Sequence, residues 1–168
     1  MEEVSLQEML AARERRSALQ TRLLQQYKKS LISFTLNIPG PVKVPDGVPQ
    51  AFATGCRRIE ALLKDRLVLV QHMETIKEKT GYEAFYCIDA NPEFIKTLMV
   101  TLEDQDRLGR LFDIDVIRPD GSKVSREELG RPSRTCLLCK EPAHACSRSR
   151  RHSVAELTAE IGHILKDL

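Results

Sequence analysis

The chain has 168 residues, of which 42% are hydrophobic and 30% are charged. This composition is typical of a folded globular protein and excludes a disordered one, and no apolar run reaches the roughly 18 residues that a membrane span needs. The 26 basic and 24 acidic residues leave a net charge of +2, and only 5% of residues are aromatic. We therefore expect neither a nucleic-acid ligand nor a membrane partner. The acidic start lacks the pattern of a secretory signal and the cysteines number five, so we expect reduced thiols and a cytoplasmic protein.

We expect one domain over residues 1–168. An amphipathic helix over 4–28 opens it, because Ser5 and Glu8 form a capping-box pattern ahead of leucines at helical spacing. The arginines and lysines on its other faces are typical of a solvated surface or of a docking surface for an acidic partner. The elements predicted after it are strand 30–38, helix 49–65, strands 67–73 and 83–89 as a hairpin, helix 92–103, strand 111–118, a Cys- and Arg-rich loop over 130–152, and helix 153–167. This order favours an α+β fold in which helices flank a mixed or antiparallel sheet.

The predicted strand 111–118 carries the most informative pattern. Because side chains alternate along a strand, Phe112, Ile114 and Val116 face one way, and Asp113 and Asp115 face the other, about 7 Å apart along the backbone. Two carboxylates this close repel each other unless a cation offsets them, and Mg²⁺ prefers such oxygen ligands together with substrate phosphates. The alternative is an exposed edge strand with two solvated aspartates.

Two groups suited to phosphate lie near this strand. Gly109 and Arg110 directly precede it, where a close approach and a phosphate-pairing guanidinium are useful. Five arginines lie within 21 residues further on, and the helix predicted after them would direct its N-terminal dipole at the same anion. A solvated charge run is the alternative. The basic cluster consists of Arg131, Arg134, Arg148, Arg150 and Arg151, followed by His152.

Cysteines also gather in the predicted loop. Cys136 and Cys139 have the spacing of a zinc-ligand pair, and the further ligands would come from among His144, Cys146 and His152. The candidate set is Cys136, Cys139, Cys146 and His152. Such a zinc ion would order the loop rather than catalyse. The alternative is a set of reduced thiols that pack together.

Three segments together resemble one known family. They read LISFTLNIPGPVK at 31–43, GRLFDIDV at 109–116, and CLLC at 136–139 continuing to CSRSRRHS at 146–153. In this order and spacing they resemble the apo-citrate lyase phosphoribosyl-dephospho-CoA transferases, also called holo-citrate lyase synthases. The resemblance extends over nearly the whole chain.

The resemblance implies a nucleotidyltransferase. The donor would be 2′-(5″-triphosphoribosyl)-3′-dephospho-CoA, the acceptor a serine of the citrate lyase acyl carrier protein (gamma chain), and the leaving group pyrophosphate. Asp113 and Asp115 would be the catalytic pair and hold Mg²⁺. Phosphate contacts would come from Gly109, Arg110, Arg134, Arg148, Arg150, Arg151 and His152. The sheet would then be nucleotidyltransferase-like, with a third carboxylate for which Asp89, Glu127 and Glu128 are candidates.

A second reading comes from another class of protein. The same arginines and cysteines would suit a non-catalytic, zinc-stabilised binding module that recognises a phosphate-bearing or acidic partner. The two readings predict different outcomes, turnover in one and stoichiometric zinc without turnover in the other.

Overall fold

The computed structural model describes all 168 residues and has an α+β architecture, as expected. Its strands form one antiparallel sheet in the order β2-β3-β1-β4. The helices are α1 (Leu6–Tyr27), α2 (Val48–Asp65), α3 (Pro92–Asp104), α4 (Ala143–Ser149) and α5 (Val154–Lys166). The strands are β1 (Ser30–Leu36), β2 (Leu69–Glu78), β3 (Gly81–Asp89) and β4 (Phe112–Ile117), and the 3₁₀ helices are η1 (Leu108–Leu111) and η2 (Glu127–Leu129).

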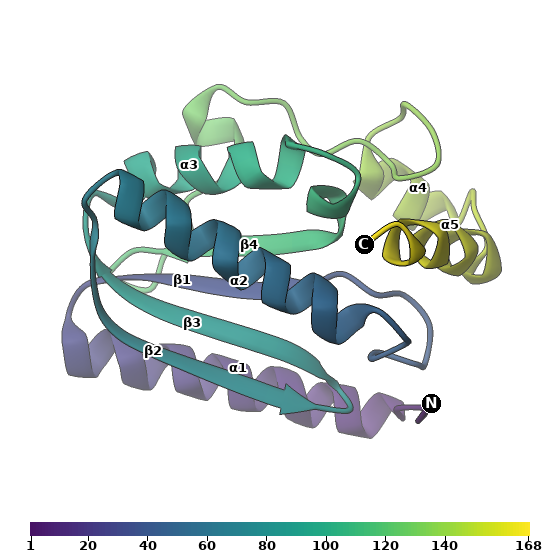
Figure 1. The fold of residues 1–168 in the computed structure, drawn as a ribbon, viewed down its shortest axis with the longest axis horizontal. Helices are drawn as coiled ribbons and strands as arrows, with labels where there is room; N and C mark the ends of the chain where they lie inside the picture. Colours follow the sequence, from purple (N-terminus) through teal and green to yellow (C-terminus); the bar gives the residue numbers. More distant parts are fainter.

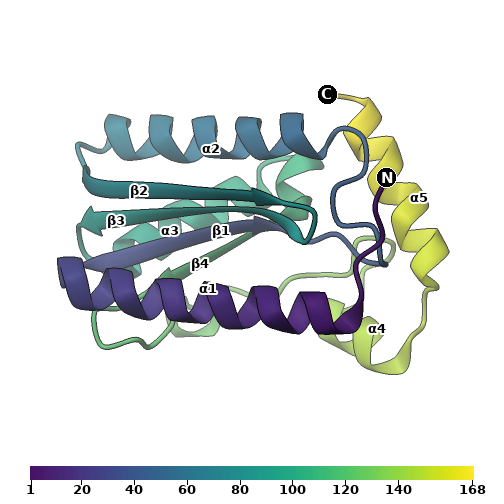
Figure 2. The ribbon, with the colours of Figure 1, turned by 90° about the horizontal axis from the view of Figure 1, so that it is seen from below.

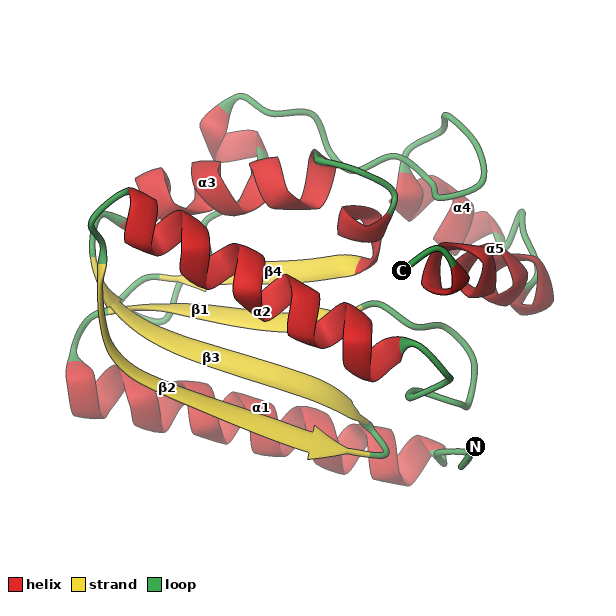
Figure 3. Ribbon diagram, in the orientation of Figure 1, coloured by secondary structure: helices red, strands yellow, loops and turns green.

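The helices lie on both faces of the sheet and at one end of it (Figures 1 and 3). Figure 2 shows α2 on one side of the strands and α1 on the other, with α4 and α5 beyond the end of the sheet. Helix α3 packs against β4 and η1, and α5 packs against η1. The end of the sheet where β4 begins therefore meets the C-terminal helices. No helix combines the length and the apolar character that a membrane span requires.

Local capping explains where two helices begin. The Ser5 side chain accepts a hydrogen bond from the Glu8 amide at 3.1 Å, and the Ser5 amide donates to the Glu8 carboxylate at 3.4 Å, which confirms the capping box. The Asn91 side chain accepts a hydrogen bond from the Phe94 amide at 2.9 Å at the start of α3. Both signals need only residues three positions apart, so the sequence alone contains them.

The sheet separates two apolar cores. Phe34 and Ile114, with their neighbours at alternate positions, join a cluster of 25 buried residues on the α2 and α3 side. A smaller cluster on the other side packs Leu31 and Phe85 against Leu23 of α1. Because Ile32 and Phe34 of β1 and alternate residues of β4 are fully buried on one face, side-chain alternation determines the register of these strands.

Part of the basic surface of α1 forms ion pairs with the sheet. Arg15, Arg16 and Arg22 form ion pairs with Glu78, Glu83 and Glu74 of β2 and β3. The Arg16–Glu83 pair is the least exposed, since 29% of the arginine side chain and 9% of the glutamate side chain reach solvent. These three arginines thus attach the helix to the strands as well as carrying charge.

Two sequence predictions of structure were wrong in detail. The segment 130–152 is not a continuous loop, because Ala143–Ser149 forms α4, which ends where Arg150 adopts a left-handed conformation with φ 52°. This helix has seven residues and buries only Cys146, so it shows no apolar period that would reveal it. The strand predicted over 67–73 instead spans Leu69–Glu78 as an edge strand.

Candidate functional site

Asp113 and Asp115 project from the face of β4 that is turned away from the larger core, on the side of the sheet where α1 and the smaller core lie. Asp113 lies beside Thr35 of β1 and Asp115 lies beside Ser33. Asp115 has a cationic partner, because the Lys123 ammonium is 3.2 Å from its carboxylate, whereas Asp113 has none. The expected alternation of this strand is therefore present, with two carboxylates on one side and Phe112, Ile114 and Val116 buried on the other.

The surroundings of Asp113 disfavour the charged form of its carboxyl group. The residue reaches solvent, but crowding by protein atoms removes part of the hydration of its carboxylate. This desolvation, followed by the negative charges of Asp115 and Glu103, raises the pKa of Asp113 above its ordinary value, and Arg134 and Lys96 partly oppose the effect. An unpaired carboxylate beside two others is a place where a cation would be stabilising.

Side chains, not another strand, cover the outer edge of β4. The Ile114 amide donates to the Glu103 carboxylate at 2.9 Å, and the buried Lys96 ammonium donates to the Ile114 carbonyl at 2.8 Å. Arg134 donates to the Phe112 carbonyl at 2.6 Å. These contacts satisfy edge groups that would otherwise be open for pairing with another chain, and they hold Asp113 between two anchored residues.

Glu103 is the buried centre of this arrangement. Only 4% of its side chain is exposed, and it lies 2.7 Å from Arg126 and 3.6 Å from Arg134. Its charge also acts on Asp113, after that of Asp115. Of the sequence candidates for a third metal-binding carboxylate, Asp89 pairs with Lys29, and Glu128 pairs with Arg118.

Sequence reasoning missed Glu103. Its signal was a charged residue on the core-facing side of helix 92–103, seven positions after Lys96 and four after Met99. A buried acid and a buried lysine separated by two helical turns lie on one helix face and indicate a polar contact inside the fold.

Gly109 and Arg110 lie in η1, at the entrance to β4. A side chain at Gly109 would place its Cβ 2.2 Å from the Leu102 carbonyl oxygen, so this glycine allows η1 to pack against the end of α3. Arg110 extends one guanidinium nitrogen to the carbonyls of Thr135 and Cys136, at 2.7 and 3.2 Å. Its other two guanidinium nitrogens have no protein partner and remain available to an anion.

A pocket of about 780 Å³ lies between the end of the sheet and the C-terminal helices. Of the residues proposed for phosphate contacts, Arg110, Arg134, Arg150 and His152 line it. Gly109, Arg148 and Arg151 do not, and neither do Asp113 and Asp115. Arg134 connects the two regions, because it lines the pocket and its charge also acts on Asp113. The remaining lining residues are Asn37, Pro39, Leu111, Thr135, Cys136, Leu137, Ala143, His144, Cys146, Ser147, Ser153, Val154, Leu157 and Ile161.

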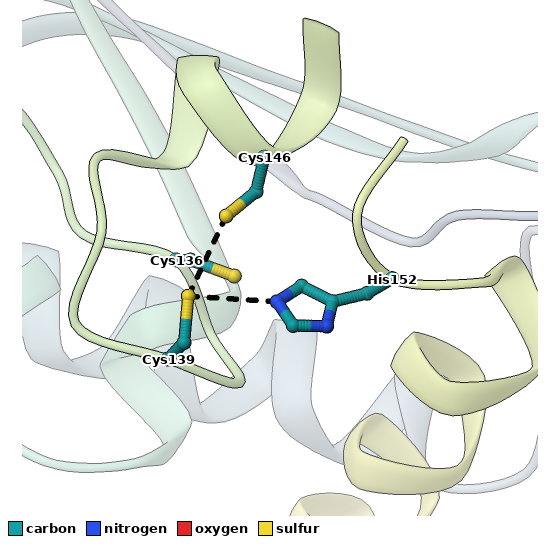
Figure 4. Close-up of side chains that lie close together, drawn as sticks. All are labelled: Cys136, Cys139, Cys146 and His152. Atoms are coloured by element: carbon teal, nitrogen blue, oxygen red, sulfur yellow. Dashed lines mark hydrogen bonds between the residues drawn. The ribbon is translucent and has the colours of Figure 1, made fainter. Parts of the chain in front are cut away.

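The sulfur atoms of Cys136, Cys139 and Cys146 and the imidazole of His152 converge beside this pocket (Figure 4). Their ligand atoms all lie within 4.8 Å of one another. The Cys139 sulfur is 3.5 Å from the Cys146 sulfur and 3.5 Å from His152 Nε2. This cysteine–histidine cluster, as we call the four residues from here on, is the candidate set that the sequence indicated, and it is able to bind a metal ion.

Comparison with known proteins identifies relatives of one kind. The family model described as "Apo-citrate lyase phosphoribosyl-dephospho-CoA transferase" matches residues 4–168. A protein of Vibrio cholerae serotype O1, named as a probable member of that family, is 39% identical over 165 residues, covering 98% of this chain and 93% of its own length. Proteins with the family name from Citrobacter koseri and, as a probable member, Streptococcus pyogenes serotype M18 are 34% and 37% identical, again over 98% of this chain, and over 90% and 86% of their own lengths.

These relatives decide between the two functional readings. The relatives are named as transferases, so the reading as a non-catalytic binding module is not favoured. The match covers the acidic strand, the pocket and the cysteine–histidine cluster together. The chain is an enzyme of the transferase class, and it belongs to the apo-citrate lyase phosphoribosyl-dephospho-CoA transferase family.

Proposed function

We propose that this chain transfers the phosphoribosyl-dephospho-CoA group from 2′-(5″-triphosphoribosyl)-3′-dephospho-CoA to a serine of the citrate lyase acyl carrier protein (gamma chain). The observation that carries this proposal is the family match over residues 4–168. The serine oxygen bonds to the α-phosphorus of the donor, the bond from that phosphorus to the bridging oxygen breaks, and pyrophosphate leaves. We further propose that all 168 residues act as one transferase domain.

The pocket has properties that suit such a donor. Its volume of about 780 Å³ falls in the range of cofactor sites, about 300–1,000 Å³. Arg110 and Arg150 supply cationic groups for phosphate oxygens, while Leu137, Val154 and Leu157 supply an apolar wall. We assign the triphosphate to the arginine side of the pocket and the less polar part of the donor to the apolar wall.

Asp113 and Asp115 are our candidates for binding Mg²⁺. The fit rests on the unpaired Asp113 carboxylate, whose pKa is raised by desolvation and by neighbouring acids, and on the position of Asp115 on the same face. When bound, the ion would neutralise charge on the phosphates. One of the two carboxylates would also accept the serine proton.

We propose a cytoplasmic location because of the thiols. All five cysteines are free in the structure, and free thiols are typical of a reducing compartment such as the cytoplasm. The carrier protein and the donor are then the partners encountered in the same compartment.

The test is incubation of the full-length protein with the apo-carrier, the triphosphoribosyl donor and Mg²⁺. We expect the carrier to gain the mass of the prosthetic group on its serine, and pyrophosphate to appear in equal amount. Asp113→Asn and Asp115→Asn should each lower the rate by about 10²-fold or more, because each removes a negatively charged ligand for the ion that neutralises the phosphates.

The matched control is Asp65→Asn. Asp65 ends α2, and 74% of its side chain is exposed, so the same chemical change there should leave the rate at the wild-type value. Absence of any carrier adduct with the wild-type protein would overturn the proposed function. A normal rate with Asp113→Asn would refute only the role of that carboxylate.

A further inference from the structure

Two of the separations within the cysteine–histidine cluster match those of a tetrahedral zinc site, and all its ligand atoms lie within 4.8 Å of one another. In a tetrahedral zinc site, bonds of about 2.3 Å to sulfur and about 2.0–2.1 Å to nitrogen place ligand atoms roughly 3.5–3.8 Å apart. The Cys139 sulfur lies 3.5 Å from both the Cys146 sulfur and His152 Nε2. Figure 4 shows the four side chains pointing toward one another. The sulfur separation is far longer than the roughly 2.05 Å of a disulfide bond.

The atoms around the cluster are those that usually support zinc ligands. The Leu138 amide points at the Cys136 sulfur at 3.4 Å, a contact that stabilises a thiolate. On the far side of the imidazole, His152 Nδ1 lies 3.6 Å from the Glu156 carboxylate. A carboxylate behind a histidine holds the ring and leaves Nε2 free to bind the metal.

We propose that Cys136, Cys139, Cys146 and His152 bind one Zn²⁺, and that this ion holds the outer wall of the pocket in place. Four protein ligands fill a tetrahedral shell and leave no open position, so the ion is structural. The ligands come from separate pieces of chain: the turn that follows Arg134, the helix α4, and the link between α4 and α5. The ion therefore ties together a segment whose regular structure is short.

The zinc ion would stabilise the pocket wall, because the segment that carries its ligands also lines the pocket. Eleven of the 18 lining residues belong to the segment from Arg134 to Ser153, both ends included. Apart from the bonds of α4 and its ends, two backbone hydrogen bonds order this segment: the Cys136 amide donates to the Glu141 carbonyl at 2.7 Å, and the Ala143 amide donates to the Arg134 carbonyl at 2.8 Å. A metal that joins these pieces replaces the apolar packing that a short, polar segment lacks.

The cluster also positions Arg110. This arginine reaches across from η1 to the carbonyls of Thr135 and Cys136, and Cys136 is itself a ligand. Fixing Cys136 therefore fixes the acceptors that orient the guanidinium at the pocket. Arg110 is in this respect a link between the zinc-bound segment and the sheet.

The test begins with zinc content. Full-length protein purified without chelator should contain one zinc ion per chain by mass spectrometry of the metal. Cobalt(II) in its place should give the intense visible bands of a tetrahedral thiolate site. Cys139→Ser and Cys146→Ser should lose most of the zinc, whereas His152→Cys, which offers a fourth sulfur, should retain it. Cys56→Ser and Cys87→Ser are matched controls, because these buried cysteines lie outside the cluster, and they should keep one zinc ion per chain.

Hydrogen exchange tests the structural role. In Cys139→Ser, amides between residues 134 and 153 should exchange at least tenfold faster, while those of β1, β3 and β4 stay protected. The site would be overturned if the purified protein contained no zinc and took up none when it was refolded with the metal. A Cys139–Cys146 disulfide in protein extracted from the cytoplasm under reducing conditions would also overturn it. Stoichiometric zinc with unchanged exchange would overturn the role of the ion in holding the wall. None of these measurements uses the donor or the carrier, so their outcome is independent of the transfer assay.

Discussion

The sharpest stability prediction concerns Glu103→Gln. The wild-type carboxylate accepts the Ile114 amide at 2.9 Å and faces Arg126 at 2.7 Å, with only 4% of the side chain exposed. Glutamine keeps one acceptor oxygen but directs an NH₂ group at a partner that is itself a donor, and it leaves the arginines without their buried counter-charge. Breaking a buried ion pair in this way costs about 3–5 kcal/mol.

The assay is urea unfolding followed by circular dichroism at neutral pH. With a urea slope of about 2 kcal/mol/M, a loss of about 3–5 kcal/mol lowers the unfolding midpoint by about 1.5–2.5 M. The matched variant is Asp104→Asn, which contacts the same Arg126 at 3.1 Å, but with 51% of the side chain exposed. Exposed pairs contribute at most about 1 kcal/mol, so its midpoint should fall by no more than about 0.5 M. Equal shifts in the two variants would refute the reasoning that burial of Glu103 sets the energy.

Two further predictions concern the stability of variants at Asp113 and Gly109. The pKa of the Asp113 carboxyl is higher in the folded protein than in the unfolded chain. As pH rises above about 4, the unfolded chain therefore loses the Asp113 proton while the folded protein still holds it. The contribution of Asp113 to the free energy of unfolding consequently falls over this range, until pH passes the folded pKa. Metal-free Asp113→Asn should therefore unfold at higher urea than wild type at neutral pH, and the gain should vanish near pH 3; a gain equal at both values would contradict this. Gly109→Ala should lose about 1–3 kcal/mol or more, because its Cβ meets the Leu102 carbonyl at 2.2 Å. In Gly162→Ala, the added Cβ in α5 meets nothing within 4 Å, so this variant should be more stable than wild type by up to about 1 kcal/mol. If the melting temperatures of both glycine variants shifted in the same direction, the packing argument would be wrong.

The relation between the two aspartates and the pocket was only partly visible in the sequence. Alternation along 111–118 correctly placed Asp113 and Asp115 on one face, because successive side chains of a strand point to opposite sides. It did not reveal that Arg134, 22 residues after Phe112, would donate to the Phe112 carbonyl, line the pocket and act on Asp113 through its charge. That contact depends on where the chain returns after β4.

Gly109 is a second case in which the sequence indicated a feature but not the neighbour that requires it. Its position before the acidic strand indicated a close approach of backbone to phosphate, and the structure adds a packing role against the last turn of α3. A glycine required for close contact looks the same in sequence whichever atom approaches it, since what matters is the absent Cβ. Only the tertiary neighbour distinguishes the two reasons.

The sequence by itself determined the features that rest on neighbours a few positions apart. These are the caps at Ser5 and Asn91, the two faces of β4, the α+β class, and a cysteine and histidine set whose spacing suits a metal. Hydrogen bonds across three residues and alternation across two are local, so residue order alone specifies them.

Tertiary structure decided which distant groups meet. It put Glu103 beside Asp113, brought Cys146 and His152 to Cys136 and Cys139, and left Arg148 and Arg151 outside the pocket that Arg110 and Arg150 share. The physical reason is that such meetings follow from how α3 packs along β4 and how α4 and α5 pack at the end of the sheet. That packing is set by the burial of apolar surface over the whole chain, and no short stretch of sequence contains it.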